Sequence, residues 1–144
     1  MVKVEDSSLK QITIPERIWQ QVCTHAQEVL PEEACGLLAG KDGGVCKVIT
    51  VPNMLHSPVK YRMDPASQLK AFLQLEADGL ELVAIFHSHP SGPDRPSQTD
   101  IVEAYYPDSA YIIVYPYKDG WKARGFLISL QTAKEIPLMI IEDI

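Results

Sequence analysis

A run of five apolar residues, 82–86, leads directly into two histidines, His87 and His89. An uninterrupted apolar run of this length is typical of a buried strand, so the rest of the chain must build a sheet around it. Side chains two positions apart project from the same face of a strand, and both imidazoles can therefore reach one point. Three prolines stiffen the loop that follows, and this loop brings Ser97 and Asp100 to the expected start of a helix.

These residue types predict a hydrolytic metal centre. Two neutral imidazoles and one carboxylate, from His87, His89 and Asp100, form a three-ligand zinc site that leaves a position for water. Zinc in such a site lowers the pKa of its bound water to about 7, so hydroxide is available at neutral pH. The stretch also has a purely structural interpretation, because Ser97-x-x-Asp100 is a helix capping box. The two interpretations are compatible, since the serine can cap the helix while the aspartate binds a metal.

Hydrolysis of an amide requires two further groups. An oxyanion develops in the tetrahedral intermediate, and Ser97 is placed to donate a hydrogen bond to it. A base must take a proton from water and pass it to the leaving nitrogen, and a carboxylate beside the metal can do both. Candidates for this base are the acidic residues at strand ends and in the proline loop, Glu32, Glu33, Asp64 and Asp94. The residues alone leave the choice among them open.

Composition bounds the class of protein. A chain of 144 residues with 46% hydrophobic and 22% charged residues is expected to form one soluble globular domain, residues 1–144. Its formal net charge of −6 argues against a basic face that binds nucleic acid. The first residues lack the apolar core of a secretory signal, and no apolar run is long enough for a membrane span. Three cysteines without a Cys-x-x-Cys pair indicate reduced thiols and hence a cytoplasmic protein.

Hydrophobic spacing and turn residues predict a single α/β domain, a mixed sheet with helices on its faces. Helices are expected at 15–30, 65–79 and 98–105, and strands at 11–14, 32–40, 45–51, 82–86, 110–117, 121–129 and 135–141. Pro15 and Pro65 suit first helical positions. Gly36 inside a strand indicates a close backbone approach or a bulge. Residues 118–120 indicate a three-residue turn, and Pro137 places part of the last strand at an edge.

Five polar positions together resemble the motif of the JAMM (MPN+, or Mov34/MPN/PAD-1) zinc metalloprotease family. That motif is a glutamate and, far downstream, His-x-His, seven residues, a serine, two residues and an aspartate. In this chain Glu33 supplies the glutamate, and His87-Ser88-His89-Pro90 is followed at the same spacings by Ser97 and Asp100. The resemblance extends from the first helix to the last strands. It implies a curved mixed sheet flanked by helices, similar to that of the cytidine deaminases.

The resemblance also implies a role for each motif residue. Glu33 is expected to act as the general base through the zinc-bound water, and Ser97 to stabilise the oxyanion. The expected Zn²⁺ ligands are His87, His89 and Asp100. The implied activity is that of a zinc-dependent peptidase or isopeptidase, which hydrolyses the amide bond after the C-terminal tail of a small ubiquitin-like or sulfur-carrier protein.

The chain is more similar to the short prokaryotic members of that family. Only nine residues, 101–109, separate Asp100 from the next expected strand, and none of them is Cys or His. The insertion that carries a second zinc in some eukaryotic members is therefore not expected here. The implied partner is a small β-grasp protein with a Gly-Gly-type tail, with no nucleic acid and no membrane. The loop with Asn53, Ser57 and Tyr61 also resembles the short members and could bind an extended tail by strand addition.

Two other functions remain as alternatives. A non-catalytic MPN scaffold would only bind partners, but such members have lost metal ligands, and none is missing here. Two histidines and one carboxylate also describe non-haem iron enzymes. The Pro-Cys-x-x-Cys signature of deaminases and the His-Glu-x-x-His signature of thermolysin-type proteases do not occur in the sequence.

Overall fold

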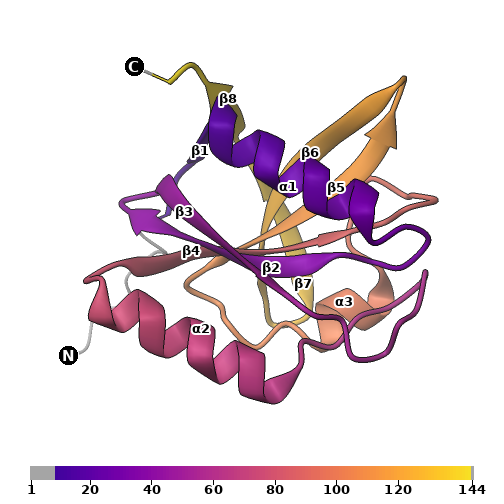
Figure 1. The fold of residues 1–144 in the computed structure, drawn as a ribbon, viewed down its shortest axis with the longest axis horizontal. Helices are drawn as coiled ribbons and strands as arrows, with labels where there is room; N and C mark the ends of the chain where they lie inside the picture. The colour runs from indigo at the N-terminus through magenta and orange to yellow at the C-terminus, as the bar shows by residue number, and fades with distance from the viewer. Residues whose placement is uncertain (1–8, 144) are drawn as a thin grey trace.

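The computed structural model describes residues 9–143, which are drawn as a coloured ribbon in Figure 1. Within these residues the helices are α1 (Glu16–Glu28), α2 (Pro65–Ala77) and α3 (Gln98–Val102), and the strands are β1 (Ile12–Pro15), β2 (Cys35–Lys41), β3 (Gly44–Val51), β4 (Glu81–Ser88), β5 (Ala110–Tyr117), β6 (Gly120–Ser129), β7 (Thr132–Ile136) and β8 (Leu138–Ile141). The N-terminal segment, in which no secretory signal was expected, lies mostly in residues 1–8, which are outside the described residues.

The strands form one sheet in the order β7-β6-β5-β4-β2-β3-β1-β8. The pairs β4–β5, β1–β3 and β1–β8 are parallel, and the other neighbours are antiparallel. The sheet is curved and nearly closed, because the two end strands follow each other in sequence and β6 contacts β8 (Figure 1). This arrangement confirms the expected fold class, a curved mixed sheet with helices on its faces.

Two hydrophobic cores lie on opposite faces of the sheet. On one face, Ile18 and Val22 of α1 pack into the cluster that contains Phe86 of β4. On the other face, Leu75 of α2 packs into the cluster that contains Ile85 of β4. Figure 1 shows the two helices on opposite sides of the sheet. Neighbouring residues of β4 thus enter different cores, which confirms the buried strand expected from the apolar run.

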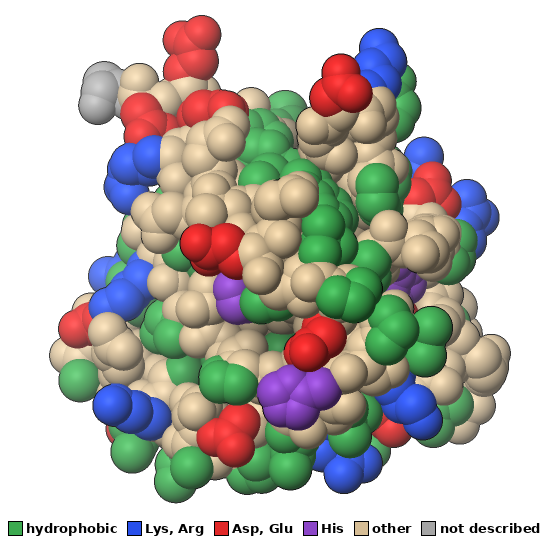
Figure 2. Space-filling view, turned by 45° about the vertical axis from the view of Figure 1, so that its right-hand side comes forward, with side chains coloured by type: hydrophobic (Ala, Val, Ile, Leu, Met, Phe, Trp, Pro, Cys, Tyr) green, Lys and Arg blue, Asp and Glu red, His purple; other side chains and the backbone are tan. Residues whose placement is uncertain are grey.

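The surface of the molecule mixes charges of both signs. Figure 2 shows Lys and Arg side chains scattered among Asp and Glu on the face in view, and hydrophobic side chains gathered in a hollow in its upper part. A shallow groove lined by Trp19, Cys23 and Trp121 runs between α1 and the turn that joins β5 to β6. Within residues 9–143, no helix has both the length and the apolar character needed to cross a membrane.

The prediction of one strand over 135–141 is wrong. β7 ends at Ile136 and pairs with β6, whereas β8 begins at Leu138 and pairs with β1 at the other end of the sheet. Pro137 separates the two strands because it has no N–H with which to continue a ladder. Its carbonyl oxygen accepts a hydrogen bond from Ile12 N at 2.9 Å, which directs the chain towards β1.

Other boundaries differ by a few residues. The turn between β5 and β6 contains two residues rather than three, because Gly120 already pairs with Tyr117. α3 ends at Val102, earlier than the predicted end near residue 105. Pro15 is the N-cap residue of α1 rather than its first helical residue, while Pro65 does open α2 as predicted.

Gly36 of β2 lies against Phe86 of β4, and the predicted close approach is confirmed. A Cβ atom at this position would lie 2.5 Å from Phe86 Cε2 and 2.6 Å from the carbonyl oxygen of Ile49. The register shifts of β2 lie further along, on either side of Ala39. Gly36 therefore allows β2, β3 and β4 to pack closely just behind the end of β4.

We expect Gly36→Ala to lower the free energy of unfolding by about 1–3 kcal/mol, because the added methyl group overpacks a buried contact. Gly120→Ala is the matched control, since a Cβ at Gly120 meets nothing within 4 Å. Urea denaturation followed by circular dichroism measures both variants. Equal stability of the two variants would contradict the close packing at Gly36.

Candidate metal centre

β4 carries His87 into the middle of the sheet, between β2 and β5. In register, His87 lies opposite Cys35 of β2 and Ile113 of β5. The His87 side chain is 1% exposed, and His89, just beyond the end of the strand, is 4% exposed. Burial lowers the pKa of the His87 imidazole. The neutral form, which is the form that binds a metal, is therefore favoured.

Three atoms of the kind that bind metals converge at this point. His87 Nε2, His89 Nε2 and Asp100 Oδ2 lie 3.1 Å from one another. Tetrahedral ligands that are 2.0–2.1 Å from a zinc ion lie roughly 3.3 Å apart. The donor types and their spacing therefore fit a small divalent metal ion. The structure brings together the three residues that the sequence predicted as ligands.

The orientation of His89 is fixed by its second ring nitrogen. His89 Nδ1 lies 2.8 Å from the carbonyl oxygen of Pro93. Because a carbonyl only accepts hydrogen bonds, a neutral His89 carries its hydrogen on Nδ1 and presents the lone pair of Nε2 to the cluster. Metal-binding histidines commonly have such a partner on the other nitrogen. The proline loop thus selects the tautomer that a metal requires.

The ring of His87 is held by stacking. The Tyr61 ring lies 4.4 Å from the His87 ring, centroid to centroid, at an interplanar angle of 25°. Within residues 9–143, the buried Nδ1 atom of His87 has no hydrogen-bond partner. Tyr61 belongs to the loop between β3 and α2, so this loop contributes a wall of the site.

Ser97 and Asp100 form the predicted capping box at the start of α3. Ser97 Oγ accepts a hydrogen bond from Asp100 N at 3.0 Å, and Ser97 N donates to Asp100 Oδ2 at 2.8 Å. The same Oδ2 atom faces His87 and His89. Burial alone would raise the pKa of the Asp100 carboxyl, but the adjacent histidines and the hydrogen bond from Ser97 N hold this pKa far below its usual range. One carboxylate therefore serves the helix and faces the cluster at once.

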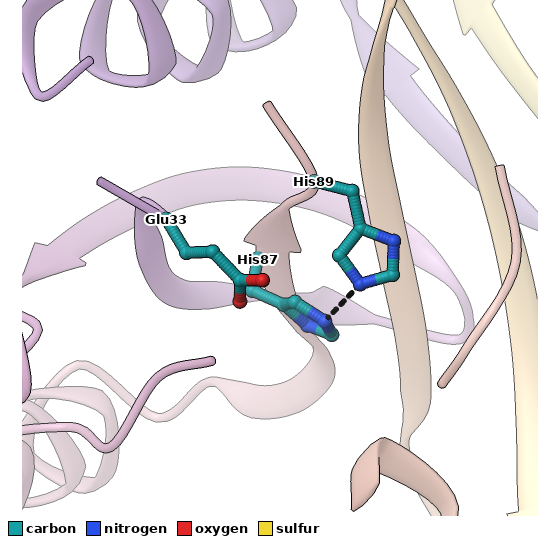
Figure 3. Close-up of side chains that lie close together, drawn as sticks. All are labelled: Glu33, His87 and His89. Carbon is teal, nitrogen blue, oxygen red and sulfur yellow. Dashed lines mark hydrogen bonds between the residues drawn. The ribbon is translucent and has the colours of Figure 1, made fainter. Parts of the chain in front are cut away.

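Glu33 lies beside the cluster, in the segment just before β2. Its side chain is 3% exposed, and one of its carboxylate oxygens groups with His87 and His89 within 4.8 Å. Figure 3 shows the Glu33 carboxylate next to the His87 ring, with a dashed line joining His87 and His89. Burial raises the pKa of the Glu33 carboxyl to about 8. Glu33 Oε1 has no hydrogen-bond partner among the residues described.

The other candidate bases have partners of their own, away from the cluster. Glu32 Oε1 lies 3.1 Å from His56 Nδ1, a largely exposed imidazole. Asp64 Oδ2 accepts a hydrogen bond from Ser67 N at 3.0 Å and so caps α2. Asp94 Oδ2 lies 3.3 Å from Arg124 Nη1. Of the four carboxylates, Glu33 is the one whose side chain groups with the two histidines.

Four hydrogen bonds fix the backbone of Glu33 and Ala34. Glu33 N donates to the Ser57 carbonyl at 2.8 Å, and the Glu33 carbonyl accepts from Asn53 Nδ2 at 3.1 Å. Ala34 N donates to Ser88 Oγ at 2.7 Å, and Ser88 N donates to the Ala34 carbonyl at 2.9 Å. The segment is thus attached on one side to the β3–α2 loop and on the other to the residue between the two histidines.

The sequence did not reveal the roles of Ser88 and Asn53. Ser88 is fully buried, and alternation along the strand points it away from the two histidines. Asn53 Nδ2 also donates to the Lys60 carbonyl at 3.1 Å, and its Oδ1 accepts from Leu55 N and Arg62 N at 3.0 and 3.1 Å. The position of Ser88 at the end of a buried strand is a signal of a structural role that the sequence does contain. The hydrogen-bond partners of Asn53, in contrast, are visible only in the folded structure.

The Cys35 side chain has a structural role in this arrangement. Its Sγ donates to the Val51 carbonyl at 3.2 Å, and it belongs to the hydrophobic cluster under α2. Burial raises the pKa of the thiol to about 12. Its neutral, apolar form is therefore favoured.

We expect Asn53→Ala to lower the free energy of unfolding by about 2 kcal/mol, because it leaves buried backbone groups of the loop and of Glu33 without partners. Ser57→Ala is the matched control in the same loop, since the Ser57 hydroxyl accepts a hydrogen bond from nearby Val59 N and the carbonyl that holds Glu33 is retained. That control should stay within about 0.5 kcal/mol of the unsubstituted protein. Denaturant titration measures both variants. An unchanged midpoint for Asn53→Ala would contradict the stabilising role of the Asn53 hydrogen bonds.

Residues 15–125 match the family described as prokaryotic homologs of the JAB domain. The chain is 44% identical over 129 residues to a Thermus thermophilus protein named "probable TtuB-protein conjugate cleaving protease", covering 89% of this chain and 82% of that protein. It is 34% identical over 124 residues to the CysO-cysteine peptidase of Mycobacterium tuberculosis, covering 83% and 84% of the two chains. A desampylase of Pyrococcus furiosus is 48% identical over 69 residues, about half of each chain.

Solved structures show the same fold. A solution structure of a Desulfitobacterium hafniense protein superimposes with a TM-score of 0.83 at 33% identity, covering 92% of this chain and 94% of that one. A JAB1/MPN domain protein from Archaeoglobus fulgidus superimposes with a TM-score of 0.59 at 22% identity, covering 91% of this chain and 100% of that one.

Proposed function

Because this chain belongs to the family of prokaryotic JAB-domain proteins, as its motif indicated, we propose that it is a zinc-dependent peptidase or isopeptidase. Its substrate is a small ubiquitin-like or sulfur-carrier protein with a Gly-Gly-type tail, and it hydrolyses the amide bond after that tail. The names of two relatives support this substrate class, since one refers to the cleavage of TtuB-protein conjugates and the other to a CysO-cysteine peptidase. The observation that carries the proposal is the 3.1 Å triangle of His87, His89 and Asp100 with Glu33 beside it.

We assign the metal site to His87, His89 and Asp100. Two imidazoles and one carboxylate match the nitrogen and oxygen ligands of catalytic zinc sites. When bound, zinc supplies a Lewis acid that polarises a carbonyl and lowers the pKa of a water to about 7. The Pro93 carbonyl and the capping interaction with Ser97 keep His89 and Asp100 in the orientation that this site requires.

Glu33 acts as the general base and then as the general acid. The attacking water adds to the carbonyl carbon of the scissile amide and gives a proton to the Glu33 carboxylate. The same proton then passes from Glu33 to the leaving nitrogen as the C–N bond breaks, which yields a carboxylic acid and an amine. Burial, which raises the pKa of Glu33 to about 8, suits a group that must both accept and release a proton near neutral pH.

Ser97 stabilises the oxyanion of the tetrahedral intermediate. Its Oγ already accepts a hydrogen bond from Asp100 N, and a hydroxyl that accepts one bond still has its own hydrogen to donate. The capping interaction holds Oγ next to the metal ligand Asp100. A donor fixed in this way contributes to catalysis without reorganising during the reaction.

We also propose that residues 1–144 form one domain and that the protein is cytoplasmic. The family match over 15–125 supports the first point. The three free cysteines, Cys23, Cys35 and Cys46, support the second, because thiols remain reduced in the cytoplasm.

The direct test is cleavage of a purified carrier protein that carries one additional residue, or a fused protein, after its Gly-Gly tail. Mass spectrometry should show release of the carrier with a free tail. A chelator should abolish cleavage, and added Zn²⁺ should restore it. Cleavage that is indifferent to the chelator, or restored by Fe²⁺ alone in an oxygen-dependent reaction, would reject the proposal. Absence of cleavage together with absence of stoichiometric metal would indicate a scaffold that only binds partners.

We expect Glu33→Gln to retain fold and bound zinc but to lower kcat by at least about 10²-fold, because the amide cannot accept the proton from water. Glu32→Gln is the matched control, since Glu32 faces His56 at the surface. Steady-state kinetics and metal analysis of both variants measure the effect. Retained turnover in Glu33→Gln, with loss in Glu32→Gln, would reverse the assignment.

We expect Asp100→Asn to lower the zinc content well below one equivalent, because a neutral amide is a much weaker ligand than a carboxylate. Asp94→Asn removes a carboxylate from the adjacent loop and should retain full zinc, since Asp94 pairs with Arg124. Atomic absorption after dialysis against a weak chelator measures the metal. Equal metal content in the two variants would remove Asp100 from the ligand set.

A further inference from the structure

A cavity of about 200 Å³ opens directly beside Asp100. It lies between the segment 60–63 and α3, and its walls include Tyr61, Tyr106 and Tyr111. Its volume corresponds to that of roughly seven waters in the liquid, which is enough for one small amino acid. The two glycines of a Gly-Gly tail have no side chains and do not need a space of this kind. The cavity is therefore suited to the other side of the scissile bond.

The walls of the cavity are held in place by contacts within the protein. The Tyr61 ring stacks on His87 at 4.4 Å, and the Tyr111 hydroxyl accepts a hydrogen bond from Tyr106 N at 2.9 Å. The Tyr106 ring lies 5.8 Å from the ring of Phe72 on α2. A ligand therefore meets a site that is largely preformed.

Two cations border this cavity. Lys60 and Arg62 flank Tyr61 in the chain, and both line the cavity. Both residues are exposed, and no ion pair joins either of them to another residue within 9–143. The chain has a net charge of −6, and the carboxylates nearby are those of Glu33 at the metal site and of Asp100 and Glu103, which also line the cavity. Cations in such a place attract an anionic group of the ligand.

The chemistry of the leaving group identifies that anion. When the leaving group is a single amino acid, its α-carboxylate is two bonds from the scissile nitrogen, about 2.5 Å away. When the leaving group is a lysine side chain of another protein, the nearby atoms are methylenes and the lysine carboxyl is consumed in a peptide bond. Only the first kind of substrate presents a carboxylate close to the metal ligands.

We infer that Lys60 and Arg62 bind the free α-carboxylate of the leaving group, and that this enzyme preferentially releases one C-terminal amino acid from its carrier protein. The tyrosine walls enclose the amino acid, and the two cations hold its carboxylate at the mouth of the cavity. This inference rests on the proposed function and defines which leaving group that function prefers. An acidic side chain in the carrier tail is the other source of a carboxylate, and the experiment separates the two.

The test compares three matched substrates. The first is a carrier with one extra amino acid after the Gly-Gly tail, as the free acid. The second is the same protein with a C-terminal amide. The third keeps the free acid but has the acidic residues next to the Gly-Gly tail replaced by their amides. The unsubstituted enzyme should cleave the first and third with equal KM, and the second with a KM about tenfold higher.

The double variant Lys60→Gln/Arg62→Gln should raise the KM for the free acid about tenfold, without changing the KM for the C-terminal amide. Lys70→Gln is the matched control, because Lys70 is an exposed residue of α2 that does not line the cavity. Binding should follow the same pattern when calorimetry measures the affinity of Glu33→Gln protein, with and without the double substitution, for the acid and the amide.

Each other result overturns the inference. Equal KM for acid and amide with the unsubstituted enzyme removes the carboxylate site, even though the proposed function stands. If the double variant has a higher KM for the first substrate and for the amide but not for the third, the two cations bind the acidic residues of the carrier tail instead. Absence of cleavage of any substrate by the unsubstituted enzyme, with zinc bound, rejects the proposed function itself.

Discussion

Three atoms with lone pairs, held 3.1 Å apart and largely away from water, are the constraint on which the rest of the site depends. Two are imidazole nitrogens and the third carries the negative charge of Asp100. A buried carboxylate is costly by several kcal/mol unless a positive charge or donors compensate it. Because their lone pairs repel one another, such atoms tend to move apart. The surrounding structure must therefore resist that movement, and a cation among them turns the repulsion into attraction.

The fold resists it by placing His87 on a central strand of the sheet and His89 directly after that strand. β4 has hydrogen-bonded neighbours on both sides and a hydrophobic core on each face. Ser88 points to the opposite face from the two imidazoles and holds Ala34 N. A shift of the histidines would therefore disturb the sheet and the segment of Glu33 together. This is why a ligand pair and a distant glutamate can keep a fixed separation.

Local sequence patterns predicted the parts of the site that local geometry determines. The spacing of His87 and His89 required only the alternation of a strand, and Ser97 and Asp100 only the geometry of a capping box. The choice of Glu33 among four carboxylates needed the family resemblance, because it depends on how distant segments meet. The split at Pro137 was missed since its cause is the pairing of β8 with β1, which no local pattern records. The Asn53 contacts and the cavity of Lys60 and Arg62 are also products of chain folding.

The parallel pairing of β8 with β1 brings the last described residues to the beginning of α1, where Asp143 Oδ2 lies 3.2 Å from Arg17 Nε. Glu33 follows the opposite end of the same helix, whose 13 residues span about 20 Å. A surface attachment made next to Asp143 would thus start from the far end of α1. Immobilising the molecule there should leave the entrance to the histidines open to a bulky carrier.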